Sequence, residues 1–226
     1  MAEREKISVD VVSDVVCPWC FIGMRRLEKA AAALPDLDIE VRWRPFQLDP
    51  TIPREGLDRR EYMVGKFGSE ERIRQMHANI MPLGEAEGIH FAFDAMEVAA
   101  NTLDAHRLIR WAGGAGADMQ NRLVTRLFAM NFEEGRNIGD HAVLIEAARE
   151  AGMDVAVVES LLPTDADLTA VQEEIAVASR MGIRGVPCFL LEGKYAVMGA
   201  QDAATLTDAL SQVAAAKASG ELVQTA

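Results

Sequence analysis

The residues with the clearest chemical potential are two cysteines near the start of the chain, Cys17 and Cys20. They enclose Pro18 and Trp19, and they lie between a strand-like apolar run, Ile7 to Val16, and a helix-like run. Two sulfur atoms three positions apart close into a disulfide only where the backbone turns tightly, and the first turn of a helix provides such a bend. This placement predicts a dithiol that cycles between the reduced and the disulfide-bonded form.

The position of each cysteine in the predicted helix indicates its role. Unpaired N–H groups and the positive end of the helix dipole favour the thiolate of Cys17, which we predict to be the nucleophile. Pro18 fits the first helical position, because its missing N–H removes a donor that has no partner there. Cys20 lies one turn deeper, so we expect it to attack the mixed disulfide on Cys17 and release the substrate. The motif alone leaves the direction of electron flow open.

Two other uses of a cysteine pair fit this chain less well. A structural zinc site needs a second pair of ligands, and the rest of the chain offers only Cys188 and four scattered histidines. A purely structural disulfide in so short a loop would remove little entropy from the unfolded chain. We therefore expect no metal site and no bound cofactor.

Length and charge limit the classes of protein to which the chain can belong. It has 226 residues, half of them apolar, which is enough for a full hydrophobic core. Its formal net charge of -12 would repel nucleic acid and anionic lipid, so neither is an expected partner. Residues 1–6 are polar, and Asp10 and Asp14 interrupt the apolar run that follows, so neither a signal peptide nor a membrane span is predicted. A cytoplasmic location is expected, where disulfides are usually transient and catalytic.

The first predicted unit consists of a strand, a helix and a second strand. The first strand is expected over residues 6–16. After the cysteine motif, apolar residues recur at helical spacing until Pro35 ends the helix. A second strand is predicted over residues 39–48. Because a helix connects the two strands, they should pair in parallel.

From about residue 57 to about residue 162 the pattern changes to a series of helices with no convincing strand. Ser69 and Asn101 are the expected caps of two of these helices, and Pro82 should kink or end the first of them. This stretch therefore has the pattern of a helical insertion.

The alternation of strands and helices resumes after the insertion. A helix terminated by Gly182 is followed by a predicted hairpin with strands at 188–191 and 195–198. A last helix should begin at Asp202. The elements after the insertion are thus a helix, two strands and a helix.

The order of these elements predicts the organisation of the whole chain. A strand, a helix and a strand, then a helical insertion, a helix, a hairpin and a helix, form a thioredoxin-like core that is split after its second strand. We therefore predict an α/β protein with two domains. Residues 1–56 and 163–226 would form the thioredoxin-like domain, and residues 57–162 an all-helical insertion domain.

Six short segments carry a resemblance to a known family. They are Ser-Asp-Val-Val-Cys-Pro-Trp-Cys-Phe-Ile-Gly at 13–23, Trp-Arg-Pro-Phe-Gln-Leu at 43–48, Asn-Thr at 101–102, Ala-His-Arg-Leu at 105–108, Gly-Ile-Arg-Gly-Val-Pro at 182–187 and Gly-Ala-Gln at 199–201. From about residue 8 to about residue 210 the chain resembles the DsbA family of thioredoxin-fold proteins, and more closely its FrnE-like branch. The resemblance implies a protein disulfide oxidoreductase whose substrates are protein or peptide thiols and disulfides, with glutathione as a redox partner.

The resemblance adds residues from the second half of the chain to the expected site. The family carries a cis-proline that faces the active-site sulfurs, and by position this would be Pro187. A cis Val186–Pro187 bond would expose backbone polar groups beside Cys17, where an extended substrate could pair. The residues expected to bind substrate are Pro18, Trp19, Val186 and Gln201.

The chain departs from the family pattern in two ways. The founding members have a histidine in place of Trp19 that helps to stabilise the thiolate, so this chain is expected to be a milder oxidant. No cysteine pair follows Cys188, which excludes a relay of electrons to such a pair. Strand alternation should turn Cys188 away from Cys17, as a buried core residue. His106 is expected to be hydrogen-bonded in the interface between the two domains.

Three functional hypotheses follow. The first is an enzyme that exchanges disulfides with protein or small thiols. The alternative is a glutathione-dependent isomerase or transferase, because hydroxychromene carboxylate isomerases and kappa-class glutathione transferases share the fold and the inserted helical domain. Those relatives usually have serine at the nucleophile position, yet free amides near Gln201 and Asp202 could hold a carboxylate of glutathione. The third is a binding or chaperone module with an idle dithiol.

Overall fold

The computed structural model describes residues 4–221. Its centre is a four-stranded sheet with the strand order β2-β1-β5-β6. β1 (Glu5–Ser13) pairs in parallel with β2 (Leu37–Pro45), as the helix between them predicts, and it pairs antiparallel with β5 (Cys188–Leu191). β5 and β6 (Tyr195–Met198) form the antiparallel hairpin, and both strands have the predicted bounds. The fold is therefore the α/β, thioredoxin-like one that the order of elements predicts.

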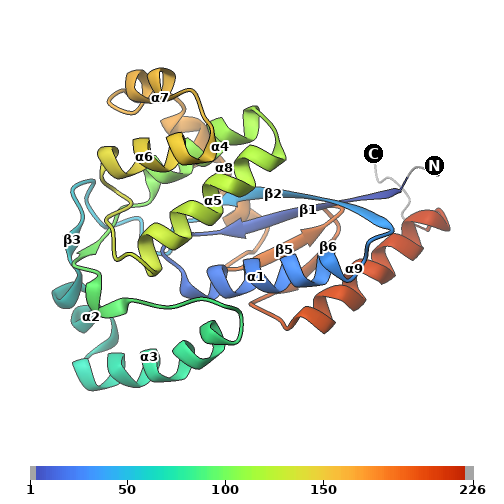
Figure 1. Cartoon of the computed structure of the whole chain (residues 1–226), viewed down its shortest axis with the longest axis horizontal. Coiled ribbons are helices and arrows are strands. Elements are labelled where there is room, and N and C mark those ends of the chain that lie inside the picture. Colours follow the sequence, from blue (N-terminus) through green and yellow to red (C-terminus); the bar gives the residue numbers. More distant parts are fainter. Residues whose placement is uncertain (1–3, 222–226) are drawn as a thin grey trace.

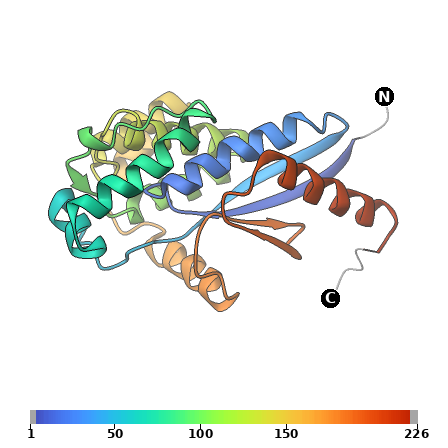
Figure 2. The ribbon, with the colours of Figure 1, turned by 90° about the horizontal axis from the view of Figure 1, so that it is seen from below.

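Three helices cover the two faces of this sheet. Figure 2 shows α1 (Pro18–Ala32) and α9 (Ala203–Ala218) on one face and α8 (Leu168–Arg180) on the other. The larger cluster of buried apolar side chains lies on the face of α1 and α9. A smaller cluster lies beneath α8 and includes Val12 and Cys188. The two central strands, β1 and β5, are thus covered on both faces, as their apolar residues require.

The helical insertion lies between β2 and α8. Figure 1 shows α2 and α3 at one end of the molecule, next to the N-terminal end of α1. Its helices are α2 (Arg59–Phe67), α3 (Glu70–Glu85), α4 (Leu103–Gly114), α5 (Ala117–Phe132), α6 (His141–Ala151) and α7 (Val155–Leu161). The insertion also contains a short 3-10 helix, Phe93–Ala95.

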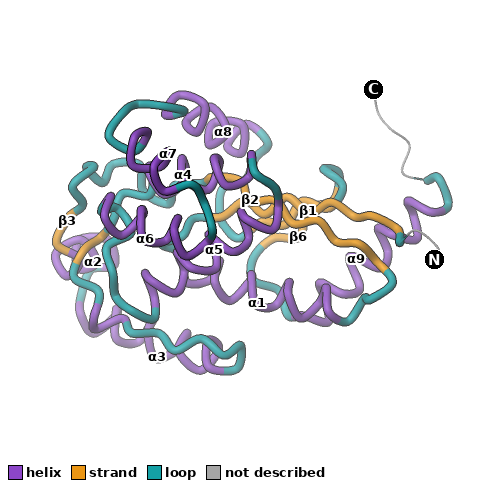
Figure 3. The backbone as a smooth tube through the Cα atoms, turned by 45° about the horizontal axis from the view of Figure 1, so that its top comes forward, coloured by secondary structure: helices purple, strands orange, loops and turns teal. Residues whose placement is uncertain are grey.

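The insertion differs from the all-helical prediction in one detail. β3 (Leu57–Asp58) and β4 (Val98–Ala99) pair antiparallel in a small ladder that is separate from the main sheet (Figure 3). Strands of two residues are too short to produce a visible alternation of apolar and polar residues, so the sequence pattern could not reveal them.

The predicted helix caps are partly as expected. Ser69 caps α3, and its hydroxyl accepts a hydrogen bond from the N–H of Arg72 at 3.2 Å. Pro82 lies inside α3, which continues for three more residues. Asn101 is not the cap residue of α4, because Thr102 holds that position. The side-chain oxygen of Asn101 still accepts a hydrogen bond from the N–H of Leu103 at 2.9 Å, so it satisfies one of the free donors at this helix start.

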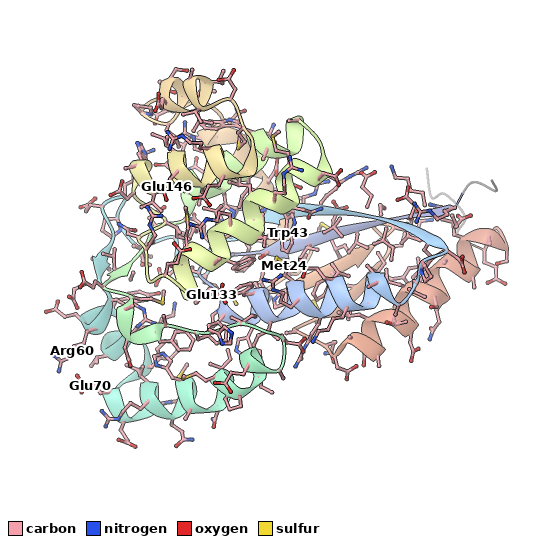
Figure 4. The ribbon with its side chains drawn as sticks, viewed as in Figure 1. Met24, Trp43, Arg60, Glu70, Glu133 and Glu146 are labelled. Atoms are coloured by element: carbon pink, nitrogen blue, oxygen red, sulfur yellow. The ribbon has the colours of Figure 1, made fainter. Side chains whose placement is uncertain are left out.

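The insertion packs against the edge of the sheet. On β2, the N–H of Trp43 donates to Oε1 of Gln120 at 2.9 Å, and the indole N–H donates to Oδ1 of Asn121 at 2.6 Å. Trp43 points into the space between β2 and α5 (Figure 4). The rings of Phe21 on α1 and Phe128 on α5 stack with centroids 5.1 Å apart. One apolar cluster therefore extends from the core into the insertion, and the division into two domains stays a prediction.

Candidate active site

The cysteine pair lies at the start of α1. Cys17 is the N-cap residue, with extended backbone angles of -94° and 112°, and Pro18 is the first helical residue. The carbonyl oxygen of Cys17 accepts hydrogen bonds from the N–H groups of Cys20 at 3.0 Å and Phe21 at 3.3 Å. The side chain of Cys17 caps no N–H group. Its sulfur therefore lies at the positive end of a helix with no bond to that helix.

A loop from the second half of the chain lies against this sulfur. The Cys17 thiol donates a weak hydrogen bond to the carbonyl oxygen of Val186, with 3.8 Å between the sulfur and oxygen atoms. The Val186–Pro187 peptide bond is cis, and Pro187 is buried. The fold thus brings Val186 to Cys17 across 169 positions of sequence.

The two thiols of the motif lie in different surroundings. All three cysteines of the chain are free thiols, and Cys20 is only 1% exposed. Burial first, and then the neighbouring Cys17 sulfur, raise the pKa of the Cys20 thiol well above its usual value. The Ser13 side chain and the Asp14 backbone act in the opposite direction. Cys20 therefore holds its proton at neutral pH.

A cavity of about 590 Å³ opens beside Cys17, between the core and helices α2 and α3. This volume lies in the range of small-molecule sites. From the core the lining includes Cys17, Pro18, Val186 and Trp19, whose side chain is 43% exposed. From the insertion the lining is mostly apolar and includes Tyr62, Met63, Met76, Ile80, Phe93 and Phe132. Four of the predicted site residues are thus brought together around one cavity.

Five acidic or basic side chains also line the cavity: Asp14, Asp49, Arg59, Lys66 and His77. Sequence reasoning proposed none of them as site residues. The interruption of an apolar run by a carboxylate was a signal for Asp14. The position of Arg59 carried no such signal, because it depends on how α2 packs against the core.

Asp14 connects the cavity to the insertion. Its carboxylate accepts a hydrogen bond from the N–H of Leu48 at 2.8 Å, and its other oxygen lies 3.4 Å from Nε2 of His106. Nε2 of His106 also lies 2.8 Å from the carbonyl oxygen of Phe46. Both side chains are buried. The expected hydrogen bond of His106 between core and insertion is therefore confirmed.

Cys188 lies away from the cavity. It packs in the smaller apolar cluster with Val12 and Ala178, whereas Cys17 belongs to the larger cluster on the other face. Burial raises the pKa of the Cys188 thiol. Both observations agree with the predicted role of Cys188 as a core residue.

Gln201 does not line the cavity. Its side-chain amide donates a hydrogen bond to the carbonyl oxygen of Met198 at 2.9 Å, near the start of α9. The expectation that free amides at this helix start hold a glutathione carboxylate stays a prediction, and a carboxylate of the chain already lies there. Asp202 is the N-cap of α9, and its own carboxylate accepts a hydrogen bond from the N–H of Thr205 at 2.8 Å. This bond lowers the pKa of Asp202.

Comparison with known proteins gives a consistent result. Residues 8–211 match the model of the DSBA-like thioredoxin domain family. The uncharacterized protein YwbO of Bacillus subtilis is 29% identical over 195 residues, which cover 86% of this chain and 90% of that protein. The probable DsbA oxidoreductase SCO1869 of Streptomyces coelicolor is 32% identical, with a TM-score of 0.83 over 92% of this chain and 89% of that structure.

A more distant structure has the same fold. A 2-hydroxychromene-2-carboxylate isomerase is 17% identical, with a TM-score of 0.71 over 94% of this chain and 98% of that structure. The family match spans the sheet, the cysteine motif at α1, the insertion and the Val186–Pro187 loop. This chain therefore belongs to the DSBA-like thioredoxin domain family.

Proposed function

We propose that this protein is a thiol-disulfide oxidoreductase that exchanges disulfides with protein or small thiols through Cys17 and Cys20. The observation that carries the proposal is the unequal placement of the two sulfurs. Cys17 is the N-cap of α1, is 4% exposed and lines a cavity, whereas Cys20 lies one turn deeper, is 1% exposed and is not part of the cavity lining. A helix N-terminus favours the thiolate of Cys17, and burial keeps Cys20 protonated until it attacks the mixed disulfide.

When the protein reduces a substrate disulfide, its own dithiol is oxidised. In the first step the Cys17 thiolate attacks one sulfur of the substrate disulfide. A mixed disulfide forms, and the other substrate sulfur leaves as a thiolate with the electron pair of the broken bond. Cys20 then loses its proton and attacks the Cys17 sulfur. The second substrate sulfur leaves as a thiolate, and the enzyme holds the Cys17–Cys20 disulfide. All steps run in reverse when the substrate is a dithiol.

Val186 and the motif residues have supporting roles in this proposal. The Val186 carbonyl lies beside the Cys17 sulfur, at the position where an extended substrate backbone would pair. Trp19 and Pro18 line the same cavity. Glutathione is the proposed small redox partner, and the cis Val186–Pro187 bond belongs to the substrate-binding surface.

An equilibrium titration of the purified protein in glutathione buffers tests this function, with the fluorescence of Trp19 as the signal. We expect a reversible two-electron transition, because a disulfide next to an indole ring quenches it. The potential would lie between about -120 mV, the value of a strong oxidant, and about -270 mV, that of a thioredoxin-like reductant. Cys17→Ser should abolish the transition and Cys188→Ala should retain it. A signal that does not change at any ratio of thiol to disulfide would contradict the proposal.

The alternative is a glutathione-dependent isomerase of the hydroxychromene carboxylate type. The observation in its favour is the apolar cavity beside Cys17, which suits an aromatic substrate. An isomerase would require glutathione and would not require Cys20. Turnover of a hydroxychromene carboxylate by the Cys20→Ser variant, with no redox transition in the wild type, would support this alternative.

A further inference from the structure

The lining of the cavity beside Cys17 includes a cation without a carboxylate partner, Arg59, which the proposed oxidoreductase reaction does not use. Arg59 reaches the cavity from the first residue of α2, and its guanidinium lies over the ring of Phe93 at 5.9 Å from the ring centroid. Its side chain donates a single hydrogen bond, to the carbonyl oxygen of Phe93 at 3.4 Å. None of the ion pairs among residues 4–221 includes Arg59. A guanidinium has five N–H donors, so most of them are available to a ligand.

The neighbouring charges do not neutralise Arg59. Lys66, the other cation of the lining, donates to the hydroxyl of Tyr62 at 2.6 Å and lies 3.7 Å from the carboxylate of Asp49. Asp14 is paired with Leu48 and faces His106. The negative charge of Asp94 raises the pKa of Arg59, but the two side chains form no ion pair. Arg59 is therefore the cation of the lining that has no carboxylate partner.

Burial lowers the pKa of Arg59, which indicates that its charge is partly removed from water. The ring of His77 stacks on Phe93, with centroids 4.1 Å apart. Burial, and then the charge of Arg59, lower the pKa of His77, so this histidine is neutral at neutral pH. The wall opposite Cys17 thus combines aromatic and methionine side chains with one available positive charge.

We infer that the cavity takes a small disulfide or thiol with an apolar body and one anionic group, which Arg59 binds while the ligand sulfur meets Cys17. Charge complementarity with Arg59 and the apolar lining define this class. The inference rests on the proposed disulfide exchange, since it names the substrate of that same site.

Two aromatic disulfides test the inference with purified, reduced protein. Dithiobis(nitrobenzoate) carries a carboxylate on each ring, and dithiodipyridine is neutral. With either probe, Cys17 forms a mixed disulfide and releases one aryl thiolate, and Cys20 then releases the second as the Cys17–Cys20 disulfide forms. Two electrons pass from the dithiol to the probe. The two thiol protons pass to the buffer with dithiobis(nitrobenzoate), whereas with dithiodipyridine the ring nitrogens of the products take them up as thiopyridones. The measured quantity is the second-order rate constant for dithiobis(nitrobenzoate) divided by that for dithiodipyridine.

Arg59→Gln should lower this ratio about tenfold, the loss typical of a charge-assisted hydrogen bond. Arg60→Gln is the matched control. Arg60 is the next residue of α2, lies at the outer surface beside Glu70 (Figure 4) and pairs with it. Both variants lose one positive charge, so long-range electrostatics change equally. In Arg59→Lys, which keeps the positive charge, the ratio should stay close to the wild-type value.

An unchanged ratio in Arg59→Gln, or an equal fall in both glutamine variants, would overturn the inference. The proposed function fails separately, if neither probe is reduced by wild-type protein.

Should Arg59→Gln not fold, the wild-type protein gives a second test. Naphthoate, but not its neutral amide, should slow the alkylation of Cys17 by iodoacetamide. Equal protection by the two compounds would contradict a role for the anionic group.

Discussion

Gly23 on α1 and Pro187 face each other so closely that a Cβ atom added to Gly23 would lie 2.9 Å from Cγ of Pro187. The same atom would lie 3.1 Å from Cζ of Phe189. Glycine in the middle of a helix costs about 1 kcal/mol relative to alanine, so a reason is needed for its presence. The reason here is that α1, with the cysteine pair at its start, packs directly against the loop that carries Val186.

Gly23→Ala should therefore destabilise the protein. Overpacking of a filled site costs about 1–3 kcal/mol, against a gain in helix propensity of about 1 kcal/mol. We expect a net loss of up to about 2 kcal/mol in the free energy of unfolding, measured by urea denaturation. Gly65→Ala on α2 is the control, because no atom lies within 4 Å of the added Cβ there. It should be neutral or stabilising, and a stabilising Gly23→Ala would refute this packing argument.

Cys17 should be alkylated before Cys20 and Cys188. Cys17 is 4% exposed and lines the cavity, whereas Cys20 and Cys188 are at most 1% exposed and lie outside it, and burial raises the pKa of both. Because the thiolate is the reactive form, Cys20 and Cys188 should react at least tenfold more slowly than Cys17, roughly one pH unit in thiolate fraction. Limited reaction of reduced protein with iodoacetamide at pH 7, followed by peptide mass mapping, measures the order. Prior labelling of Cys20 would reverse the assigned roles.

The stability of the reduced protein should fall as the pH rises above about 8.5, where cysteines of the unfolded chain begin to ionise. Native Cys20 and Cys188 hold their protons at that pH because their pKa values are raised. The native state then binds more protons than the unfolded state, so the free energy of unfolding decreases with pH. Urea denaturation between neutral and alkaline pH measures this slope. It should be shallower in the Cys20→Ser, Cys188→Ala double variant, and an equal slope would exclude these thiols as its cause.

Gln120→Ala should loosen the attachment of the insertion to β2. The buried Gln120 side chain accepts from the N–H of Trp43 and donates to the carbonyl oxygens of Trp43 and Ile109. Its loss leaves buried backbone groups without partners, at a cost of about 1–3 kcal/mol. Gln75→Ala is the control, since Gln75 is exposed and bonds only to Asn79. Its change in unfolding free energy should stay within about 0.5 kcal/mol. Equal effects of the two variants would show that the Trp43 bonds are not stabilising.

Much of the chemistry follows from local sequence. Cys17 and Cys20 could be placed at a helix start because a strand-like run precedes them and Pro18 suits the first helical position. The parallel pairing of β1 and β2 followed from the helix between them, and the hairpin from a turn at Glu192 and Gly193. These features depend on neighbouring residues, whose spacing is visible in the sequence.

Tertiary packing alone decided what surrounds the cysteines. Arg59, His77 and Phe93 line the same cavity as Cys17 because α2 and α3 lie next to the start of α1, and no periodicity of the sequence indicates that arrangement. The same packing leaves Gln201 outside the cavity, bonded to Met198. The sequence by itself determined the place of the cysteine pair at a helix start and the order of the elements, since both are set by short-range backbone and periodicity effects. The shape, polarity and single available charge of the cavity arise from contacts between distant segments, which only the folded chain brings together.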